Sequence, residues 1–353
     1  MKKILPITIF FILIFSGCAS HRTLIMSENG KISLKGAGIW NISEPELLNQ
    51  YHTSISFLDN GNVYIWKGNS KEIVGFNQKG KKIFDTSPII FYSHLGELHL
   101  FHDGKIIGEY FSNNEDFRLD IGFLIFDENG KIKDKWYWDF RESQKYTPYG
   151  HNIHILSDSL LIVSGHGWVG KNQMLFGKFK YPKTDFLTLG GSIGPGYDGG
   201  GLTWSFSKSI MVDSSLFYVV ATSPLIRELN LDLEFASNKG VQGKHYNLGD
   251  LENKPNFGYW DYDKEAEPFQ DWMMRNSRTI DLFQHGNYSC VLYREVFEDN
   301  DKYWCQVYSK DFENYYGEIQ LPEMPIGRDS KYIYFRDMSK NEPRIMKTKI
   351  RVK

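Results

Sequence analysis

Two histidines and one arginine are the residues of this sequence best suited to acid–base chemistry in an interior channel. His52 in YHTSISFLDNGN and His151 in YGHNIHILSDS each stand at the start of a predicted strand, and Arg278 is the arginine that we expect beside them. Imidazoles can transfer protons and a guanidinium can hold an anion. The alternative is that they are ordinary hydrogen-bonded side chains. The sequence contains no His-Glu-x-x-His and no Cys-x-x-Cys motif, so we expect no metal and no cofactor.

Two stretches are longer than a connection between strands needs. Residues 190–201 read GGSIGPGYDGGG and include Tyr197 and Asp198, whereas residues 240–276 are rich in aromatic and acidic residues and include Trp260 and Trp272. Irregular loops on a rigid scaffold often bind ligands, so these four side chains are predicted ligand contacts. The alternatives are a flexible surface loop in the first stretch and a solvated acidic insertion, packed by its own rings, in the second.

The N-terminus predicts export. Lys2 and Lys3 precede a 13-residue stretch that is apolar apart from Thr8 and Ser16, and small residues lead into Cys18. This stretch is shorter than the ~20 residues that a membrane-spanning helix needs. The four residues that end at Cys18 resemble the lipobox of bacterial lipoproteins, which implies a signal peptide at 1–17, an acylated Cys18 and an anchor in the outer membrane. The alternative is an ordinary secretory signal that is cleaved near Ala19.

Composition restricts the partners and the fold class. There are 41 Lys and Arg against 43 Asp and Glu, without a long block of one sign, so nucleic acid is not an expected partner. Aromatic residues make up 16% of the chain, enough to bury a large apolar surface and to favour β-strands. The two remaining thiols, Cys290 and Cys305, lie on either side of a predicted acidic turn, which does not place them opposite each other. Whether they form a disulfide stays open.

A repeat near 50 residues organises the chain. MSENGKISL, FNQKGKKIF and FDENGKIKD carry glycines at 30, 80 and 130, and each reads as a hairpin turn. Less regular turns continue the series near 182, 232 and 312. A second set, near 60, 96, 158, 214, 286 and 330, alternates strictly with the first. Two turns per repeat indicate four strands per repeat, and a period of this size indicates a propeller or solenoid.

The order of the turns predicts how the ring closes. The chain begins with a turn of the first set and ends with one of the second, so the last repeat is incomplete and residues 22–36 are expected to complete it. We therefore predict an all-β fold, a six-bladed β-propeller of four-stranded blades, as one domain over residues 18–353. Two β-sandwich domains are the alternative.

The segment FLDNGNVYIWKGNSKEIVGFNQKGKKIFD resembles one blade of the six-bladed propellers that include NHL-type and TolB-like domains, many of them exported lipoproteins. This resemblance implies the fold and leaves the activity open. The predicted function is a lipid-anchored binding or assembly module of the bacterial cell envelope for a protein or glycan ligand. The alternative is a propeller enzyme with histidines in the central channel, either a hydrolase or lyase or one that resembles the arylsulfotransferase propellers.

Overall fold

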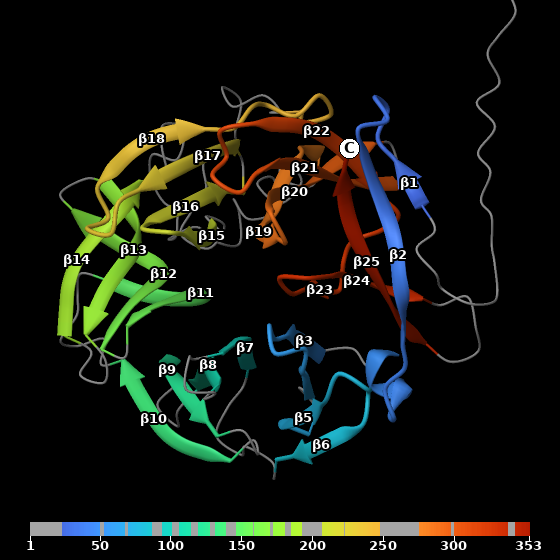
Figure 1. Ribbon diagram of the computed structural model, residues 1–353. Coiled ribbons are helices and arrows are strands. Elements are labelled where there is room, and N and C mark those ends of the chain that lie inside the picture. Colours follow the sequence, from blue (N-terminus) through green and yellow to red (C-terminus); the bar gives the residue numbers. More distant parts are fainter. Residues whose placement is uncertain are drawn as a thin grey trace, which may run out of the picture.

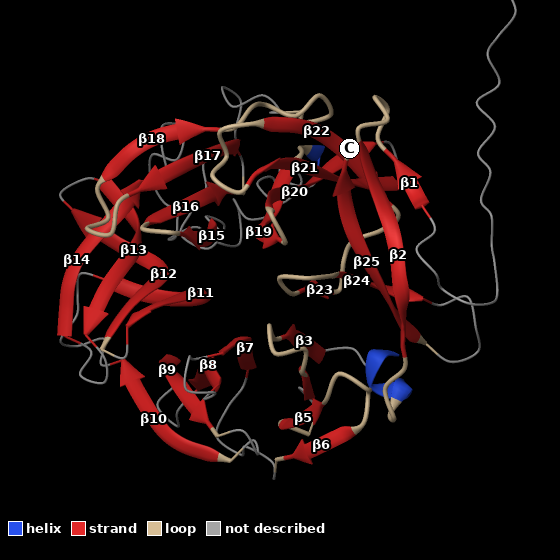
Figure 2. Ribbon diagram, viewed as in Figure 1, coloured by secondary structure: helices blue, strands red, loops and turns tan. Residues whose placement is uncertain are grey.

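The computed structural model places six β-sheets around a central axis, each running from the centre of the ring outward (Figure 1). Strands dominate the fold, and the short 3-10 helix η1 (Pro45–Asn49) precedes the first blade (Figure 2). The structure describes residues 23–49, 53–67, 70–86, 94–100, 106–113, 119–127, 131–138, 146–157, 159–169, 172–180, 185–192, 207–221, 223–247, 275–297, 300–337 and 343–353. The predicted all-β, six-bladed propeller is confirmed.

Blades one to three are antiparallel four-stranded meanders whose first strand lies nearest the axis. Blade one contains β3 (Thr53–Phe57), β4 (Val63–Lys67), β5 (Glu72–Phe76) and β6 (Lys82–Asp85). Blade two contains β7 (His94–Leu100), β8 (Ile106–Asn113), β9 (Leu119–Phe126) and β10 (Ile132–Trp138). Blade three contains β11 (Tyr146–Ser157), β12 (Leu160–Val169), β13 (Asn172–Lys180) and β14 (Asp185–Ser192).

Blades four and five repeat this pattern. Blade four contains β15 (Ser207–Val212), β16 (Ser215–Val220), β17 (Ser223–Leu229) and β18 (Phe235–Lys239). Blade five contains β19 (Arg278–His285), β20 (Tyr288–Phe297), β21 (Asn300–Ser309) and β22 (Tyr315–Leu321).

Blade six joins the two ends of the chain. Its inner strands β23 (Gly327–Arg328), β24 (Ile333–Asp337) and β25 (Arg344–Val352) come from the C-terminus, whereas β2 (Ile32–Trp40) and β1 (Thr23–Met26) come from the N-terminus. β2 pairs antiparallel with β25 from Ile32 opposite Val352 to Trp40 opposite Ile345. The predicted closure is therefore confirmed, with one difference. β1 adds a fifth strand to this blade, so it is wider than the four strands expected.

The glycine turns share one left-handed position. Gly30 and Gly80 have φ angles of 67° and 77°, and the corresponding positions of blades four and five hold Leu233 and Phe312, with φ angles of 64° and 62°. A left-handed backbone disfavours residues with a Cβ atom, by about 1–2 kcal/mol. Both side chains are nearly fully buried, so apolar burial offsets this cost. The turn predicted at Gly96 is wrong, because β7 continues through this position as an irregular strand.

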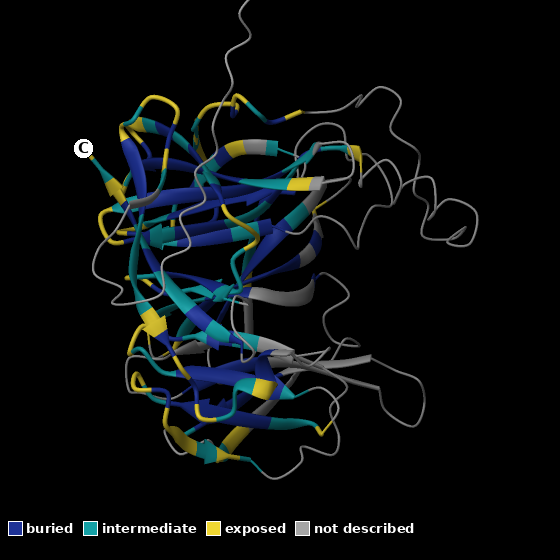
Figure 3. Cartoon of the chain, turned by 90° about the vertical axis from the view of Figure 1, so that its right-hand side faces the viewer, coloured by how far each residue is buried: buried dark blue, intermediate teal, exposed yellow. Residues whose placement is uncertain are grey.

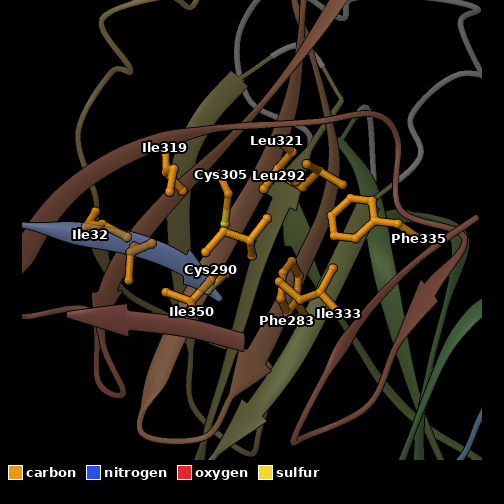
Figure 4. Packing of buried hydrophobic residues seen from close by; sticks show 12 residues of the cluster. Ile32, Phe283, Cys290, Leu292, Cys305, Ile319, Leu321, Ile333, Phe335 and Ile350 are labelled. Atoms are coloured by element: carbon orange, nitrogen blue, oxygen red, sulfur yellow. The ribbon is translucent and has the colours of Figure 1, made fainter. Parts of the chain in front are cut away.

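Buried apolar side chains form clusters between neighbouring blades. The buried positions lie along the strands of the ring (Figure 3). The cluster between blades five and six includes both thiols (Figure 4). Cys290 lies opposite Val307, and Cys305 lies opposite Leu292, so the two are not direct cross-strand partners, as expected. Both are free and buried, and burial raises the pKa of Cys290.

Candidate functional site

The innermost strands of neighbouring blades are joined by polar contacts along the ring's inner wall. Asn152 on β11 donates through Nδ2 to the carbonyl of Ser207 on β15 (3.1 Å), and Ser56 on β3 accepts from the backbone N–H of Leu98 on β7 (3.0 Å). Arg328 forms a bidentate pair with Asp281 on β19, at 2.6 and 3.0 Å. These side chains hold the ring together.

Arg278, the first residue of β19, differs from these bridging residues. It is half-buried, and within the described part of the chain its guanidinium makes no hydrogen bond or ion pair. The residue directly opposite on β20 is Arg294, which is 4% exposed and pairs with Asp301 at 3.4 Å. Burial lowers the pKa of Arg278, and Arg294 lowers it further, whereas Asp301 and Tyr303 act in the opposite direction. The site therefore holds two cations close together.

The ends of the long insertion meet beside Arg278. The backbone N–H of Ser277 donates to the carbonyl of Asn247 (3.2 Å), and the backbone N–H of Asn247 donates to Ser277 Oγ (3.0 Å). Thr279 then ties the same strand to blade four, because its backbone N–H donates to the carbonyl of Ala221 at 2.7 Å. Asn247 and Ser277, the described ends of the insertion, therefore lie next to Arg278.

The first part of the insertion packs on the face of blade five that is turned toward blade four. The His245 ring stacks on Trp304, with ring centres 3.7 Å apart and planes 7° apart. Carboxylate oxygens of Glu28, Glu295 and Glu318 lie 3.8–3.9 Å from its nitrogens. Sequence reasoning placed residues 240–247 in a solvated insertion, but the structure shows that they pack against a blade.

A glycine makes this close packing possible. A Cβ atom at Gly243 would lie 2.8 Å from the Tyr293 hydroxyl and 3.0 Å from Glu318 Oε2. The Tyr293 hydroxyl donates to the same Glu318 oxygen at 2.8 Å, and burial followed by Glu318 raises the pKa of Tyr293. These contacts fix the path by which the chain reaches Asn247.

The predicted site residues have different outcomes. Arg278 lies on an innermost strand, as expected. His151 lies within β11, but its side chain is outside the described residues. His52, Tyr197, Asp198, Trp260, Trp272 and Cys18, with the whole segment 1–17, also lie outside them. The convergence of the two histidines with Arg278 therefore stays a prediction.

The beginning of the glycine-rich stretch has a structural role. Gly190 and Gly191 are in β14, and a Cβ atom at Gly190 would lie 2.0 Å from the carbonyl oxygen of Leu233 in blade four. These two glycines allow the close approach of blades three and four, so the flexible loop expected from residue 190 onward is wrong for them.

Sequence reasoning missed Arg294. An arginine inside the apolar segment YSCVLYREVF was a usable signal, since a buried cation needs a partner. Its pairing with Arg278 depends on the register of β19 and β20, which the pattern alone does not determine. Chemically, the two guanidinium groups can hold a carboxylate, sulfate or phosphate.

Within the described ranges, no group of three or more His, Cys, Asp and Glu side chains is arranged to hold a metal ion. No helix in this part of the chain is long and apolar enough to cross a membrane.

Comparison with solved structures shows what the chain is similar to. A proposed exported protein of Bacteroides fragilis matches with a TM-score of 0.56 and 11% identity, over 94% of this chain and 98% of that one. A protein of unknown function from Dyadobacter fermentans matches with a TM-score of 0.50 and 10% identity, over 91% and 99%. The PQQ-bound aldose sugar dehydrogenase of Streptomyces coelicolor matches with a TM-score of 0.47 and 11% identity, over 91% and 99%.

At these identities the likeness establishes the fold alone. In sequence, no protein-family model matches the chain. No curated protein matches it either.

Proposed function

We propose that this protein is an exported, lipid-anchored propeller that binds an anionic ligand at the inner edge of blade five. The observation that carries the proposal is the half-buried Arg278, held directly opposite Arg294. The ligand is an acidic glycan or an acidic segment of another envelope protein. Trp260 and Trp272, which lie in the insertion, are proposed to contact the same ligand.

The charge arrangement supports binding of an anion. Two guanidinium groups on adjacent strands repel each other, and Asp301 pairs with only one of them. A carboxylate or sulfate bound between them removes this repulsion and accepts bidentate hydrogen bonds. A neutral ligand gains neither of these contributions.

A binding role is favoured over catalysis because polar side chains of the inner strands already hold the blades together. Asn152, Ser56 and the Asp281–Arg328 pair are engaged in contacts between blades. The enzyme alternative depends on His52 and His151 and remains a prediction.

The proposed location is the bacterial cell envelope, with the acyl chains on Cys18 inserted in the outer membrane. The signal-like segment 1–17 supports export, and Ala19 after the cysteine supports outer-membrane sorting. The membrane and an envelope protein or glycan are the proposed partners, and nucleic acid is not.

Polygalacturonate, a carboxylated glycan, and neutral dextran are suitable probes for affinity electrophoresis of the purified protein. We expect retardation by polygalacturonate only, and about tenfold weaker binding for Arg278→Gln, because a hydrogen bond to a charged group contributes about 1.5–3 kcal/mol. Arg278→Lys should bind with intermediate strength, since it keeps the charge and loses the planar fork.

Lys180→Gln removes an exposed cation from blade three and serves as the matched control. Arg278→Gln should melt at the same temperature as the parent or higher, because it relieves repulsion from Arg294. Unchanged retardation of a stably folded Arg278→Gln variant would show that this arginine does not bind the ligand.

A further inference from the structure

Blade six carries a charge opposite to that of the rest of the protein. The two sequence segments that contain its strands, 22–40 and 325–353, have twelve Lys and Arg residues and four Asp and Glu residues, a net charge of +8. The whole chain has a net charge of -2. The remainder is therefore strongly acidic, and positive charge is concentrated in the blade that closes the ring.

Four of these cations share one face of the sheet. Alternation along β25 places Lys347, Lys349 and Arg351 on one side of the strand, and Lys35 on β2 lies directly opposite Lys349. We call these four residues the basic row. The other side of β25 carries Met346 and Ile350, which pack against blade five. The basic row thus faces away from blade five, on the side of β25 whose first residue, Ile345, packs against blade one. Along this side Lys347 and Lys349 are partly buried, and Arg351 is exposed.

Within the described part of the protein, none of the four residues of the basic row makes an ion pair. Lys349 Nζ lies 4.6 Å from the centre of the Tyr332 ring, and Lys347 Nζ lies 5.6 Å from it. The nearby carboxylate of Asp329 is engaged elsewhere, because it accepts hydrogen bonds from two backbone N–H groups and from the Tyr334 hydroxyl. Burial lowers the pKa of Lys347, and Asp329 acts in the opposite direction. Lys347 Nζ also lies 5.4 Å from the centre of the Trp40 ring. These rings position the two lysines without neutralising their charge.

The same blade is the one nearest to the expected anchor. β1 begins at Thr23, five residues after Cys18, and a chain of that length reaches at most about 17 Å. This reach is short compared with the bilayer, which is about 40 Å thick with its headgroups. Acyl chains on Cys18 would therefore hold blade six at the membrane surface.

We infer that the basic row contacts the anionic headgroups of the membrane in which the protein is anchored. This inference rests on the lipid anchor of the proposed function. From Lys347 to Arg351 the row extends about 13 Å along β25, which is longer than a single phosphate group and suits an array of headgroups. Removal of residues 1–18 leaves a net charge of -4, so overall charge opposes binding and the local basic row must provide the attraction.

Vesicle binding of residues 19–353, which contain every strand of the ring, tests this inference without acyl chains. The vesicles are phosphatidylcholine alone or with about one third phosphatidylglycerol, and binding is measured by co-sedimentation at low salt. The variant Lys35→Gln/Lys349→Gln/Arg351→Gln is compared with Lys131→Gln/Lys180→Gln/Lys310→Gln, which removes three exposed lysines from other blades.

We expect binding only to the phosphatidylglycerol vesicles, with a partition coefficient about 100-fold lower for the basic-row variant. The control variant should bind within a few-fold of the parent, and both should melt like the parent. Equal binding of the two variants would overturn the inference. Displacement by inorganic phosphate at constant ionic strength would also overturn it, because the row would then be a site for a free anion.

The result does not depend on acylation. If Cys18 proves not to be lipidated, the proposed anchor fails, and the vesicle result still decides whether the basic row binds headgroups.

Discussion

His285, the last residue of the innermost strand of blade five, accepts a hydrogen bond through Nε2 from the backbone N–H of Ile350 in blade six, at 3.1 Å. The imidazole is 3% exposed. Burial, followed by the nearby Lys349 and Arg351, lowers its pKa to about 4 from the ordinary value of 6.5. Only the neutral ring can accept this bond, so the contact between these blades depends on a deprotonated histidine.

Acidification should therefore weaken the fold. Between pH 6.5 and about 4, His285 is protonated in the unfolded chain but not in the native protein. Its contribution to the free energy of unfolding is therefore fully present above pH 6.5 and is lost as the pH falls through this range. The loss should be about 3 kcal/mol. Urea unfolding of the parent and of His285→Gln, whose amide does not titrate, isolates this contribution. Parallel pH profiles for the two proteins would refute it.

Ring closure provides a second prediction. Deleting residues 19–36 removes β1 and half of β2, which exposes the edge of β25 and the apolar side chains that Ile32 and Leu34 cover. We expect aggregation, or a melting temperature lower by about 10 °C. Deleting residues 19–22, which precede β1, is the control and should change neither. A monomeric 19–36 deletion of normal stability would mean that the N-terminal strands do not hold the ring closed.

Substitution by alanine should reduce stability much more at one glycine than at another that holds the same turn position. Gly30 and Gly80 have similar positive φ angles, but a Cβ atom at Gly80 would lie 1.8 Å from the Asn41 carbonyl oxygen, whereas at Gly30 the nearest atom is 3.8 Å away. Gly30→Ala should cost about 1 kcal/mol from backbone strain. Gly80→Ala should cost at least about 2 kcal/mol more, because the chain at Asn41 must move. Equal losses in chemical unfolding would contradict this steric argument.

The architecture was predictable because it depends on local turn chemistry repeated along the chain. Gly30 and Gly80 mark hairpins that the structure contains, and the mismatch between the first and last turns indicated where the ring closes. The same reasoning failed at Gly96, because a glycine in an irregular strand has the same sequence signature as a glycine in a turn. The turn predicted near Phe312 is present, but its left-handed phenylalanine was not foreseen, because packing on Phe217 and Tyr308 stabilises that backbone rather than a glycine.

The candidate site was predictable only in part, because it depends on register and on contacts between blades. Arg278 was predicted as a site residue because it lies at the start of a blade. The position of Arg294 opposite it follows only from the pairing of β19 with β20. The stacking of His245 on Trp304 joins an insertion to a strand about 60 residues away, and no local pattern encodes such a contact.

The insertion provides a separate test of ligand binding. Replacing Trp260 and Trp272 by Ala should weaken retardation by polygalacturonate while the melting temperature stays within a few degrees of the parent, if the two rings contact ligand. If the rings serve packing, stability should fall first. A stably folded double variant with unchanged retardation would exclude both as ligand contacts.

The mass of the N-terminal peptide of the protein purified from membranes tests the account most directly, because export and anchoring decide which partners it can meet. We expect Cys18 as the first residue, carrying a thioether-linked diacylglycerol, and we expect Cys18→Ala to lack the lipid and leave the membrane fraction. A peptide that begins at Met1, or an unmodified one that begins near Ala19, would contradict a lipid-anchored protein of the cell envelope.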